Sequence, residues 1–594
     1  MTFADFYDAL DAELDALIAE NPQDIRLHKG DESTRKSFAF LIWFIKFYGK
    51  RPIYNLNITE GDDDTSCDII FSSPDNVGKK IFYVVQAKWK SKKNCTEKLD
   101  STAFKATLDD FKLVYSGQKQ FSSKNENFNR QYENLKQHLA ENQYVKFVYL
   151  TLCQTNPSVS ENIELFKKQY ADIEIIDIER LRRDFIEARY KQIKPQNPLE
   201  YDYNPEVETI TLPIEQLDIE KNFLRVDAPY ISYTFLIRPK TVYELFEKYG
   251  FKLFFSNIRN PLIASEYNRQ IEQTMLDAPD FFWYYNNGIT AITRDLPRRI
   301  NATAQQIEIT GFQIINGAQT VYSVYKAYRD AKNGKRDTIN KALLQLRIVQ
   351  SINKEFDLDI TRYTNQQNPT EPRDFWANDP VQVRLQNESF GTNYWYSIRR
   401  GEFREVPKHV KVVSSEEFMK VYFEFLDDSW NNNISALWVS QKDYLDELGF
   451  LQGEYEKHFN EHTKFEDLLV AYRLNEAIAS LFNFIGHTDS PSDFSLEDIE
   501  LHTQHLLSDM RIVLSMVFGK NLNKRVFDKL NKTNNFINDT ITFIIQTREN
   551  YLIKNPEAKA FYPIHDIEAI VKNMNILVTE EQIEKSDWTT YFRI

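Results

Sequence analysis

The chain has 594 residues, of which 42% are hydrophobic, and its formal net charge is −14. This length exceeds the size at which a single hydrophobic core keeps growing, so we expect roughly two to four domains. The acidic balance excludes a protein that coats nucleic acid without selection, because such proteins are usually basic, and any contact with nucleic acid must therefore be local.

The three cysteines and the apolar segments limit the cellular compartments in which we expect the protein. No cysteine pair has the CxxC spacing, which excludes a cysteine-based zinc module and a disulfide framework and favours a reducing compartment. No run approaches the ~18 apolar residues of a membrane span, and the acidic N-terminus has the wrong charge for a targeting peptide. We therefore expect a cytoplasmic protein that makes no membrane contact.

Residues 1–195 show the alternation of helices and strands that is typical of a compact α/β domain. The expected elements are a helix at 3–20, a buried helix capped by Asp31 or Ser33, strands at 53–59, 67–71 and 81–88, a helix at 99–117, a strand at 145–153, a helix at 159–171, a strand at 173–178 and a helix at 179–192. The order is αβββαβ, followed by αβα. A stretch rich in Pro, Asn and charge, 193–208, marks the first domain boundary.

The remainder of the chain divides by its periodicity. Residues 209–440 alternate between short strands and helices, whereas helical periodicity dominates 441–594. We therefore expect an α/β (α+β) multidomain protein, with a mixed α/β central domain at 209–440 and an all-α C-terminal domain at 441–594.

The strand at 81–88 is apolar until it ends in Gln86 and Lys88. Residues two apart in a strand point to the same face, so these two side chains lie together. If the strands at 67–71 and 81–88 pair as a hairpin, Asp68 lies across from that end. Carboxylate and amide oxygens are the hard ligands that Mg²⁺ prefers, so Asp68 and Gln86 are candidate ligands of Mg²⁺ or Mn²⁺.

Lys88 lies where it would orient or deprotonate a metal-bound water and stabilise charge that develops on a phosphate. Gln86 in place of an acidic ligand leaves less negative charge on the metal, which predicts weaker affinity at a workable site. The alternative is an ordinary hairpin with an Asp near its turn, because the pattern QxK is short and weak.

The D…QxK hairpin within an αβββαβ order resembles the PD-(D/E)xK nuclease fold, and specifically its Mrr-like branch. The resemblance implies a restriction-endonuclease-like domain at 1–195 in which Asp68, Gln86 and Lys88 are catalytic. It also implies an acidic residue from the first core helix, for which Glu32 is the candidate, although a Glu at a helix start also complements the helix dipole. Where the branch has a glycine-rich segment, this chain has EGDDDTSCD, and whether Asp62, Asp63 or Asp64 also contacts the ion stays open.

Two stretches of the central region, FFWYYNNGIT and GFQIINGAQTVYSVY, each bring a strand or an aromatic run to Asn-Gly. Asn-Gly tolerates positive φ and lets a backbone approach a ligand closely, and amides at a following helix N-terminus favour an anion. The candidate residues for a nucleotide or DNA ligand are Asn286, Asn287, Asn316, Gly317, Gln319, Thr320, Arg362, Asn365, Arg399 and Arg400. The alternative is that these turns only shape the fold and satisfy buried backbone.

The sequences NIRNPL, NNGIT, INGAQT, TNQQNP and RRGE, in this order between about 230 and 430, resemble the AIPR family, named for abortive infection and phage resistance. The layout strand-Asn-Gly-x-Gln-helix in INGAQT is also similar to that of ParB/sulfiredoxin-like and DGQHR-type domains, which handle nucleotides. Arg362 or Arg399 would then supply the positive charge that pairs with the nucleotide phosphate. These resemblances imply a prokaryotic defence protein acting as a Mg²⁺-dependent DNA endonuclease, with a homodimer expected for a duplex cutter. Two alternatives stay open: a non-catalytic nucleic-acid or nucleotide sensor, and a nucleotide hydrolase centred on Asn316 and Gln319.

Overall fold

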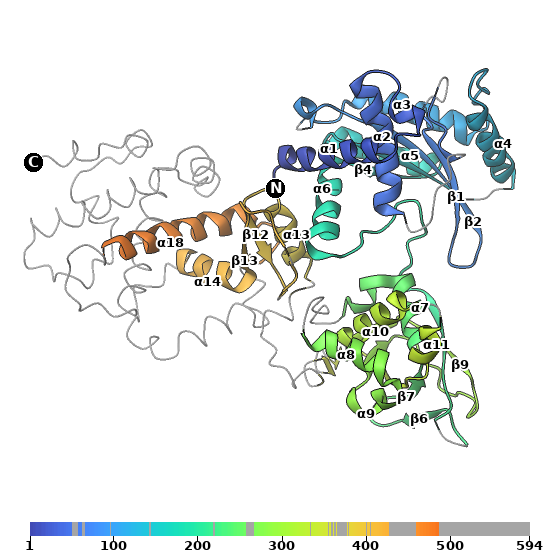
Figure 1. The fold of residues 1–594 in the computed structure, drawn as a ribbon, viewed down its shortest axis with the longest axis vertical. Coiled ribbons are helices and arrows are strands. Elements are labelled where there is room, and N and C mark those ends of the chain that lie inside the picture. Colours follow the sequence, from blue (N-terminus) through green and yellow to red (C-terminus); the bar gives the residue numbers. More distant parts are fainter. Residues whose placement is uncertain are drawn as a thin grey trace, which may run out of the picture. The chain divides into compact units, whose positions relative to one another are not determined.

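The protein is described from a computed structural model of the 594 residues (Figure 1). The described residues are 1–49, 57–61, 66–95, 97–141, 144–217, 220–256, 266–332, 334–353, 356–357, 360–361, 364, 377, 379–399, 401–403, 405–426 and 459–485. The chain divides into two compact units. The first comprises Met1–Gln367, Phe390–Thr392 and Gly401–Lys408, and the second comprises Asn368–Ser389, Asn393–Arg400 and His409–Ile594. Within the described residues the architecture is mixed α/β with several sheets.

The N-terminal part of the first unit is built around a four-stranded sheet with the order β1-β2-β3-β4. Its strands are β1 (Ile69–Pro74), β2 (Lys80–Lys88), β3 (Val145–Thr151) and β4 (Asp172–Ile176). β1 and β2 form an antiparallel hairpin, drawn as the long blue pair in Figure 1, whereas β3 and β4 continue the sheet in parallel. The helices of this part are α1 (Phe3–Glu20), α2 (Glu32–Tyr48), α3 (Ser101–Tyr115), α4 (Glu126–Ala140), α5 (Pro157–Gln169) and α6 (Ile178–Ile186).

Local capping explains where several of these helices begin. Asp31 precedes α2, and its side chain accepts a hydrogen bond from the Thr34 amide at 2.8 Å, as the sequence predicts for an N-cap. Asp100 and Asn156 cap α3 and α5 in the same way. The expected helix at 179–192 is observed as α6 followed by a π-helical turn, Glu187–Lys191.

Two sequence expectations in this region need revision or fall outside the described residues. α4 was not expected, because the segment is polar and only its buried Phe128, Tyr132 and Leu135 mark the helical face. Most of the expected strand at 53–59 lies outside the described residues, and its described end contributes an antiparallel bridge between Ile58 and Ile69.

The central part of the first unit holds a five-stranded sheet with the order β10-β8-β11-β7-β6. The strands are β6 (Phe223–Val226), β7 (Ser232–Ile237), β8 (Ile289–Thr293), β10 (Gln313–Asn316) and β11 (Leu344–Gln350). β8 and β11 are parallel, and the other pairs are antiparallel. A separate ribbon pairs β5 (Thr209–Pro213) with β9 (Gln306–Thr310). The helices are α7 (Pro239–Tyr249), α8 (Glu266–Asp277), α9 (Phe282–Tyr285), α10 (Ala318–Asp330) and α11 (Lys335–Ile339).

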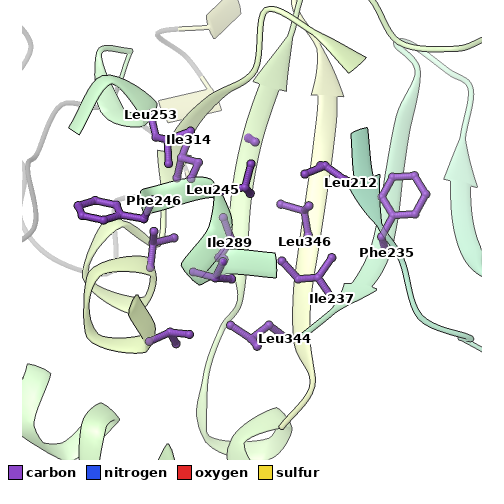
Figure 2. Packing of buried hydrophobic residues seen from close by; sticks show 14 of the residues in the cluster. Leu212, Phe235, Ile237, Leu245, Phe246, Leu253, Ile289, Ile314, Leu344 and Leu346 are labelled. Atoms are coloured by element: carbon purple, nitrogen blue, oxygen red, sulfur yellow. The ribbon is translucent and has the colours of Figure 1, made fainter. Parts of the chain in front are cut away.

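One face of this sheet packs against helices to form the hydrophobic core drawn in Figure 2. Leu344 and Leu346 of β11 meet Ile289 of β8 there, with Leu245 and Phe246 of α7 in the same cluster. Since alternate residues of a strand point to opposite faces, Gln345 and Arg347 of β11 lie on the other face. Burial of this cluster is the main stabilising contribution to the central part, because apolar area removed from water dominates folding.

The described portion of the second unit is smaller. It contains α13 (Pro380–Ser389), β12 (Tyr394–Ser397), β13 (Lys411–Ser414), α14 (Ser415–Leu426) and α18 (Phe465–Ile485). β12 and β13 pair in parallel. α18 agrees with the helical pattern expected after 441, and the rest of 441–594 lies largely outside the described residues. Among the helices of the described residues, none combines the length and the apolar character that a membrane crossing requires.

Candidate active site

The β1–β2 hairpin brings Asp68, Gln86 and Lys88 to one end of the sheet. Ile69 pairs with Val85 in the ladder, and the Asp68 amide donates to the Val85 carbonyl at 2.7 Å. Asp68 therefore lies opposite Gln86, as the sequence analysis expected from the pairing of the two strands. The even-numbered residues Phe82 and Val84 of β2 face the core formed with α3, α4 and α5, so Gln86 and Lys88 continue that face.

A buried hydrogen-bonded pair forms the centre of this end. Asp68 is 6% exposed and Gln86 is 3% exposed. One carboxylate oxygen of Asp68 accepts a hydrogen bond from Gln86 Nε2 at 2.7 Å and another from the Ala87 amide at 2.6 Å. Gln86 Nε2 also contacts the Ala87 carbonyl at 3.2 Å. The pair is thus held rigidly at the strand end by both side-chain and backbone groups.

The other amide atom of Gln86 has no such partner. Gln86 Oε1 is buried and accepts no hydrogen bond from any residue that the structure describes. A buried acceptor without a partner costs about 1–3 kcal/mol, so each such atom in a folded protein calls for an explanation. An oxygen ligand to a divalent cation is one such explanation, because Mg²⁺ is bound by few protein oxygens and keeps several waters.

The residues present fit a metal of this kind, although only one carboxylate is involved. Within the described ranges, no three His, Cys, Asp or Glu side chains gather where they could hold an ion. Asp68 and Gln86 would therefore act with backbone oxygen and water. Asp62, Asp63 and Asp64 lie outside the described residues.

Lys88 differs from the pair in being exposed at the end of β2. Its ammonium makes no hydrogen bond or ion pair with any residue that the structure describes. The next residue, Trp89, packs against Tyr7 and Phe40 with ring centroids 5.3 and 5.5 Å apart. This packing fixes the strand end from the opposite face and keeps Lys88 on the face that carries Gln86.

Tyr149 on β3 is a neighbour of this site that the sequence did not single out. Gln86 pairs with Tyr149 across the parallel β2–β3 ladder, and Tyr149 is 2% exposed. Burial raises the pKa of Tyr149, and the charges of Cys153 and Asp68 add to the shift. Only the strand pairing, which joins residues far apart in sequence, could have identified it.

Glu32 is not joined to this cluster by any interaction in the described part of the chain. It is the first residue of α2, directly after the capping Asp31, and it is exposed. This is the arrangement in which a carboxylate complements the positive end of the helix dipole.

The two Asn-Gly turns of the central part lie directly against each other. Gly317 has φ +91°, and a Cβ on it would lie 2.7 Å from the Gly288 carbonyl oxygen. Gly288 has φ +79°, and a Cβ there would lie 2.6 Å from the Gln345 carbonyl oxygen. Both glycines are therefore required by conformation and by close packing.

The polar side chains of these turns bond to the protein itself. Asn286 contacts the Thr320 hydroxyl at 3.1 Å and accepts from the Gly288 amide at 2.9 Å. Asn316 Nδ2 donates to the Thr364 carbonyl at 2.5 Å. These bonds match the interpretation in which the turns satisfy backbone groups and shape the fold. Asn287 is exposed, and Gln319 is half-buried at the start of α10.

The basic candidates belong to other parts of the chain than these turns. Arg399 is half-buried in the second unit, whereas the Asn-Gly turns belong to the first. Arg362, Asn365 and Arg400 lie outside the described residues.

Comparison with known proteins gives one match. A family model described as "AIPR protein" matches residues 254–589, which is more than half of the chain. No curated protein and no solved structure matches the chain significantly. The matched range includes NIRNPL, NNGIT, INGAQT, TNQQNP and RRGE, the segments on which the sequence analysis based this resemblance. The chain therefore belongs to the AIPR protein family.

Proposed function

We propose that this protein acts in prokaryotic defence against phage as a Mg²⁺- or Mn²⁺-dependent DNA endonuclease whose active site is the end of the β1–β2 hairpin. The observation that carries the proposal is the buried Asp68–Gln86 pair, in which Gln86 Oε1 has no partner, beside the exposed and unpaired Lys88. The order of elements around the hairpin supports it, because α2 precedes the strands, and α3 and α4 lie between β2 and the parallel β3. α4 adds a helix to the αβββαβ order that the PD-(D/E)xK resemblance implies, and the first of the three implied strands, 53–59, lies mostly outside the described residues.

Each residue has a distinct role in the proposed hydrolysis. Asp68 and Gln86 would hold the cation, which when bound neutralises phosphate charge and lowers the pKa of water. Lys88 would orient the attacking water, and its ammonium would stabilise the negative charge that builds on the phosphate oxygens. Hydrolysis adds water across one P–O bond of the backbone, leaving a phosphate monoester and a hydroxyl.

The central domain would recognise the nucleic acid or sense a nucleotide, and a homodimer would place two hairpins on the two strands of a duplex. The main rival is a protein of the same fold that binds nucleic acid without cutting it. In that case the Asp68–Gln86 hydrogen bond would be structural only. A second rival, a nucleotide hydrolase centred on Asn316 and Gln319, predicts nucleotide turnover that survives the loss of Lys88.

The test is cleavage of plasmid, linear and single-stranded DNA and of RNA, with Mg²⁺ or Mn²⁺, by the wild type and by Lys88→Ala. Loss of a positioned acid–base or charge-stabilising group lowers a rate by about 10²–10⁴-fold. Lys93→Ala is the matched control, because Lys93 is an exposed lysine of the same basic segment. The proposal predicts metal-dependent cleavage that Lys88→Ala loses and Lys93→Ala keeps. Equal cleavage by both variants, or none by the wild type with or without added nucleotides, would refute it.

A further inference from the structure

Four exposed aromatic side chains gather on a single turn of the central part. Phe281, Trp283, Tyr284 and Tyr285 are 54%, 40%, 76% and 68% exposed, and we call this group the aromatic turn. Isolated exposed apolar residues are normal, but a contiguous apolar patch on a folded protein usually marks a binding site. Phe282, in the middle of the run, is 2% exposed and belongs to the hydrophobic core. Phe282 thus anchors the backbone of the turn in the core, while the side chains of the neighbouring aromatic residues remain in solvent.

The rings of the aromatic turn are already arranged with respect to each other. Phe281 and Tyr285 stack with centroids 6.0 Å apart and an interplanar angle of 18°. A pre-formed stack loses little conformational entropy when a flat ligand adds to it, and preorganisation of this kind favours binding. Aromatic rings in such a stack are suited to hold nucleobases, which bind by stacking without sequence preference.

The strand beside the aromatic turn carries a cation without a partner. α9 packs beside β11, and Arg347 lies in the middle of β11 on the face opposite the core. Arg347 is half-buried, its Nε atom is buried, and within the described ranges this atom has no hydrogen-bond partner and the residue forms no ion pair. A buried donor that is left unsatisfied is costly, so an anionic ligand that accepts from it would remove that cost.

The surroundings of Arg347 suit a phosphate. Thr234 and Thr290 are its partners in the two flanking strands, so the three side chains share one face of the sheet. Hydroxyls and guanidinium groups are common donors to nucleic-acid phosphates. Gln345, two residues before Arg347, contacts Gly288 just after the aromatic turn. Arg347 is two residues, or about 7 Å, further along β11 than Gln345, so a strand of several nucleotides that lies on the rings can extend to this arginine.

From these observations we infer that the aromatic turn and Arg347 form a binding surface for single-stranded nucleic acid. Bases stack on the exposed rings, and a backbone phosphate pairs with the guanidinium. An open surface with such high ring exposure fits a strand better than an enclosed small molecule, which proteins hold in concave pockets. A protein partner would also cover aromatic rings, but it would not by itself account for the unpaired cation. The surface shares no residue with the hairpin site, and the inference rests on the proposed recognition of nucleic acid by the central domain, which it makes specific.

The experiment measures binding of a labelled single-stranded oligonucleotide of mixed sequence by fluorescence anisotropy. The measurement is made in EDTA with Lys88→Ala as the parent protein, so that the oligonucleotide is not cleaved. A failure to bind would therefore overturn this inference without refuting the proposed endonuclease activity. Tyr284→Ala and Tyr285→Ala should each weaken binding by roughly tenfold, from the loss of one base stack. The corresponding Tyr→Phe variants should bind as the parent does, because the ring remains. Tyr230→Ala is the control, since Tyr230 is 39% exposed near the other end of β11.

The role of Arg347 is tested through the salt dependence of binding. Arg347→Met keeps the length of the side chain and should reduce the slope of log K against log salt by roughly 0.7 for one lost phosphate contact. Arg298→Met, at an exposed arginine in the loop after β8, should leave the slope unchanged. A parent protein that binds duplex or mononucleotide as tightly as the single strand, or that binds no oligonucleotide, overturns the inference. Unchanged affinity in both Tyr→Ala variants does the same.

Discussion

The close packing of the two Asn-Gly turns makes Gly317→Ala a sharp test of the central fold. Gly317 precedes α10 with φ +91°, and an added Cβ would lie 2.7 Å from the Gly288 carbonyl oxygen and 3.1 Å from the Ile289 Cα. Both are backbone atoms, so neither can move aside as the end of a flexible side chain would. The substitution therefore combines an unfavourable φ with a steric overlap.

Gly334 separates these two contributions. It has φ +94°, before α11, but no atom lies within 4 Å of the position of its Cβ. The left-handed conformation costs an alanine about 1–2 kcal/mol, and the lower entropy of the unfolded chain returns about 0.4–1 kcal/mol. Gly334→Ala should therefore lower the free energy of unfolding by about 1 kcal/mol. At Gly317 the overlap adds about 1–3 kcal/mol, for a total of about 2–4 kcal/mol.

The assay is urea unfolding of the full chain followed by tryptophan fluorescence, with wild type, Gly317→Ala and Gly334→Ala measured side by side. Trp283 lies near the turns and reports on this region. The reasoning fails if the two variants lose the same free energy of unfolding, because the contact between the turns would then contribute nothing.

Three further substitutions test interactions in the N-terminal part, each by the change in the free energy of unfolding. Asp68→Ala removes the carboxylate that accepts from two buried donors and should cost about 2–4 kcal/mol; a neutral effect would show that the pair is not formed. Lys36→Met removes a buried ammonium that lies 2.7 and 2.6 Å from the carboxylates of Asp11 and Asp15 in α1. Because these carboxylates are partly exposed, the expected cost is about 1–2 kcal/mol. A stabilised variant would contradict this contact. Tyr48→Phe removes a 2.8 Å hydrogen bond to the buried Asp184 and should cost about 1.5–3 kcal/mol; wild-type stability would mean that this bond is absent.

These effects also guide the choice of variants for the enzymatic tests. Asp68 contributes to both the fold and the proposed site, so its loss alone does not separate the two. Lys88 is exposed and makes no bond within the described structure, and its replacement should leave stability within about 0.5 kcal/mol of the wild type. An activity change in Lys88→Ala therefore reports on chemistry.

The features that the sequence predicted correctly are those that depend on local patterns of residues. The alternation in β2 was sufficient to place Gln86 and Lys88 on one face, and the capping pattern limited the start of α2 to Asp31 or Ser33, of which Asp31 is the observed cap. Both features depend on residues close together in sequence. α4 was missed because its polar composition hides a helical face of only a few apolar residues.

Other features depend on contacts between distant segments. In the sequence, Arg347 looks like any polar residue that alternates with apolar residues in a strand. The absence of a hydrogen-bond partner for its Nε atom among the described residues becomes apparent only when β7 and β8 are paired with β11. The orphaned oxygen of Gln86 likewise depends on which amide atom bonds to Asp68. Sequence patterns identified Gln86 as a candidate but not Arg347, and they carry no information on which atoms of either residue remain unsatisfied.

The most direct test of the central claim is calorimetric titration of Mg²⁺ and Mn²⁺ into wild type, Asp68→Ala and Gln86→Glu, because it requires neither the substrate nor an activating signal. A metal site predicts binding by the wild type, no binding by Asp68→Ala, and tighter binding by Gln86→Glu, whose second carboxylate adds negative charge beside Asp68. A purely structural pair predicts no binding in any of the three proteins. That result would contradict the account and leave the hairpin as a scaffold.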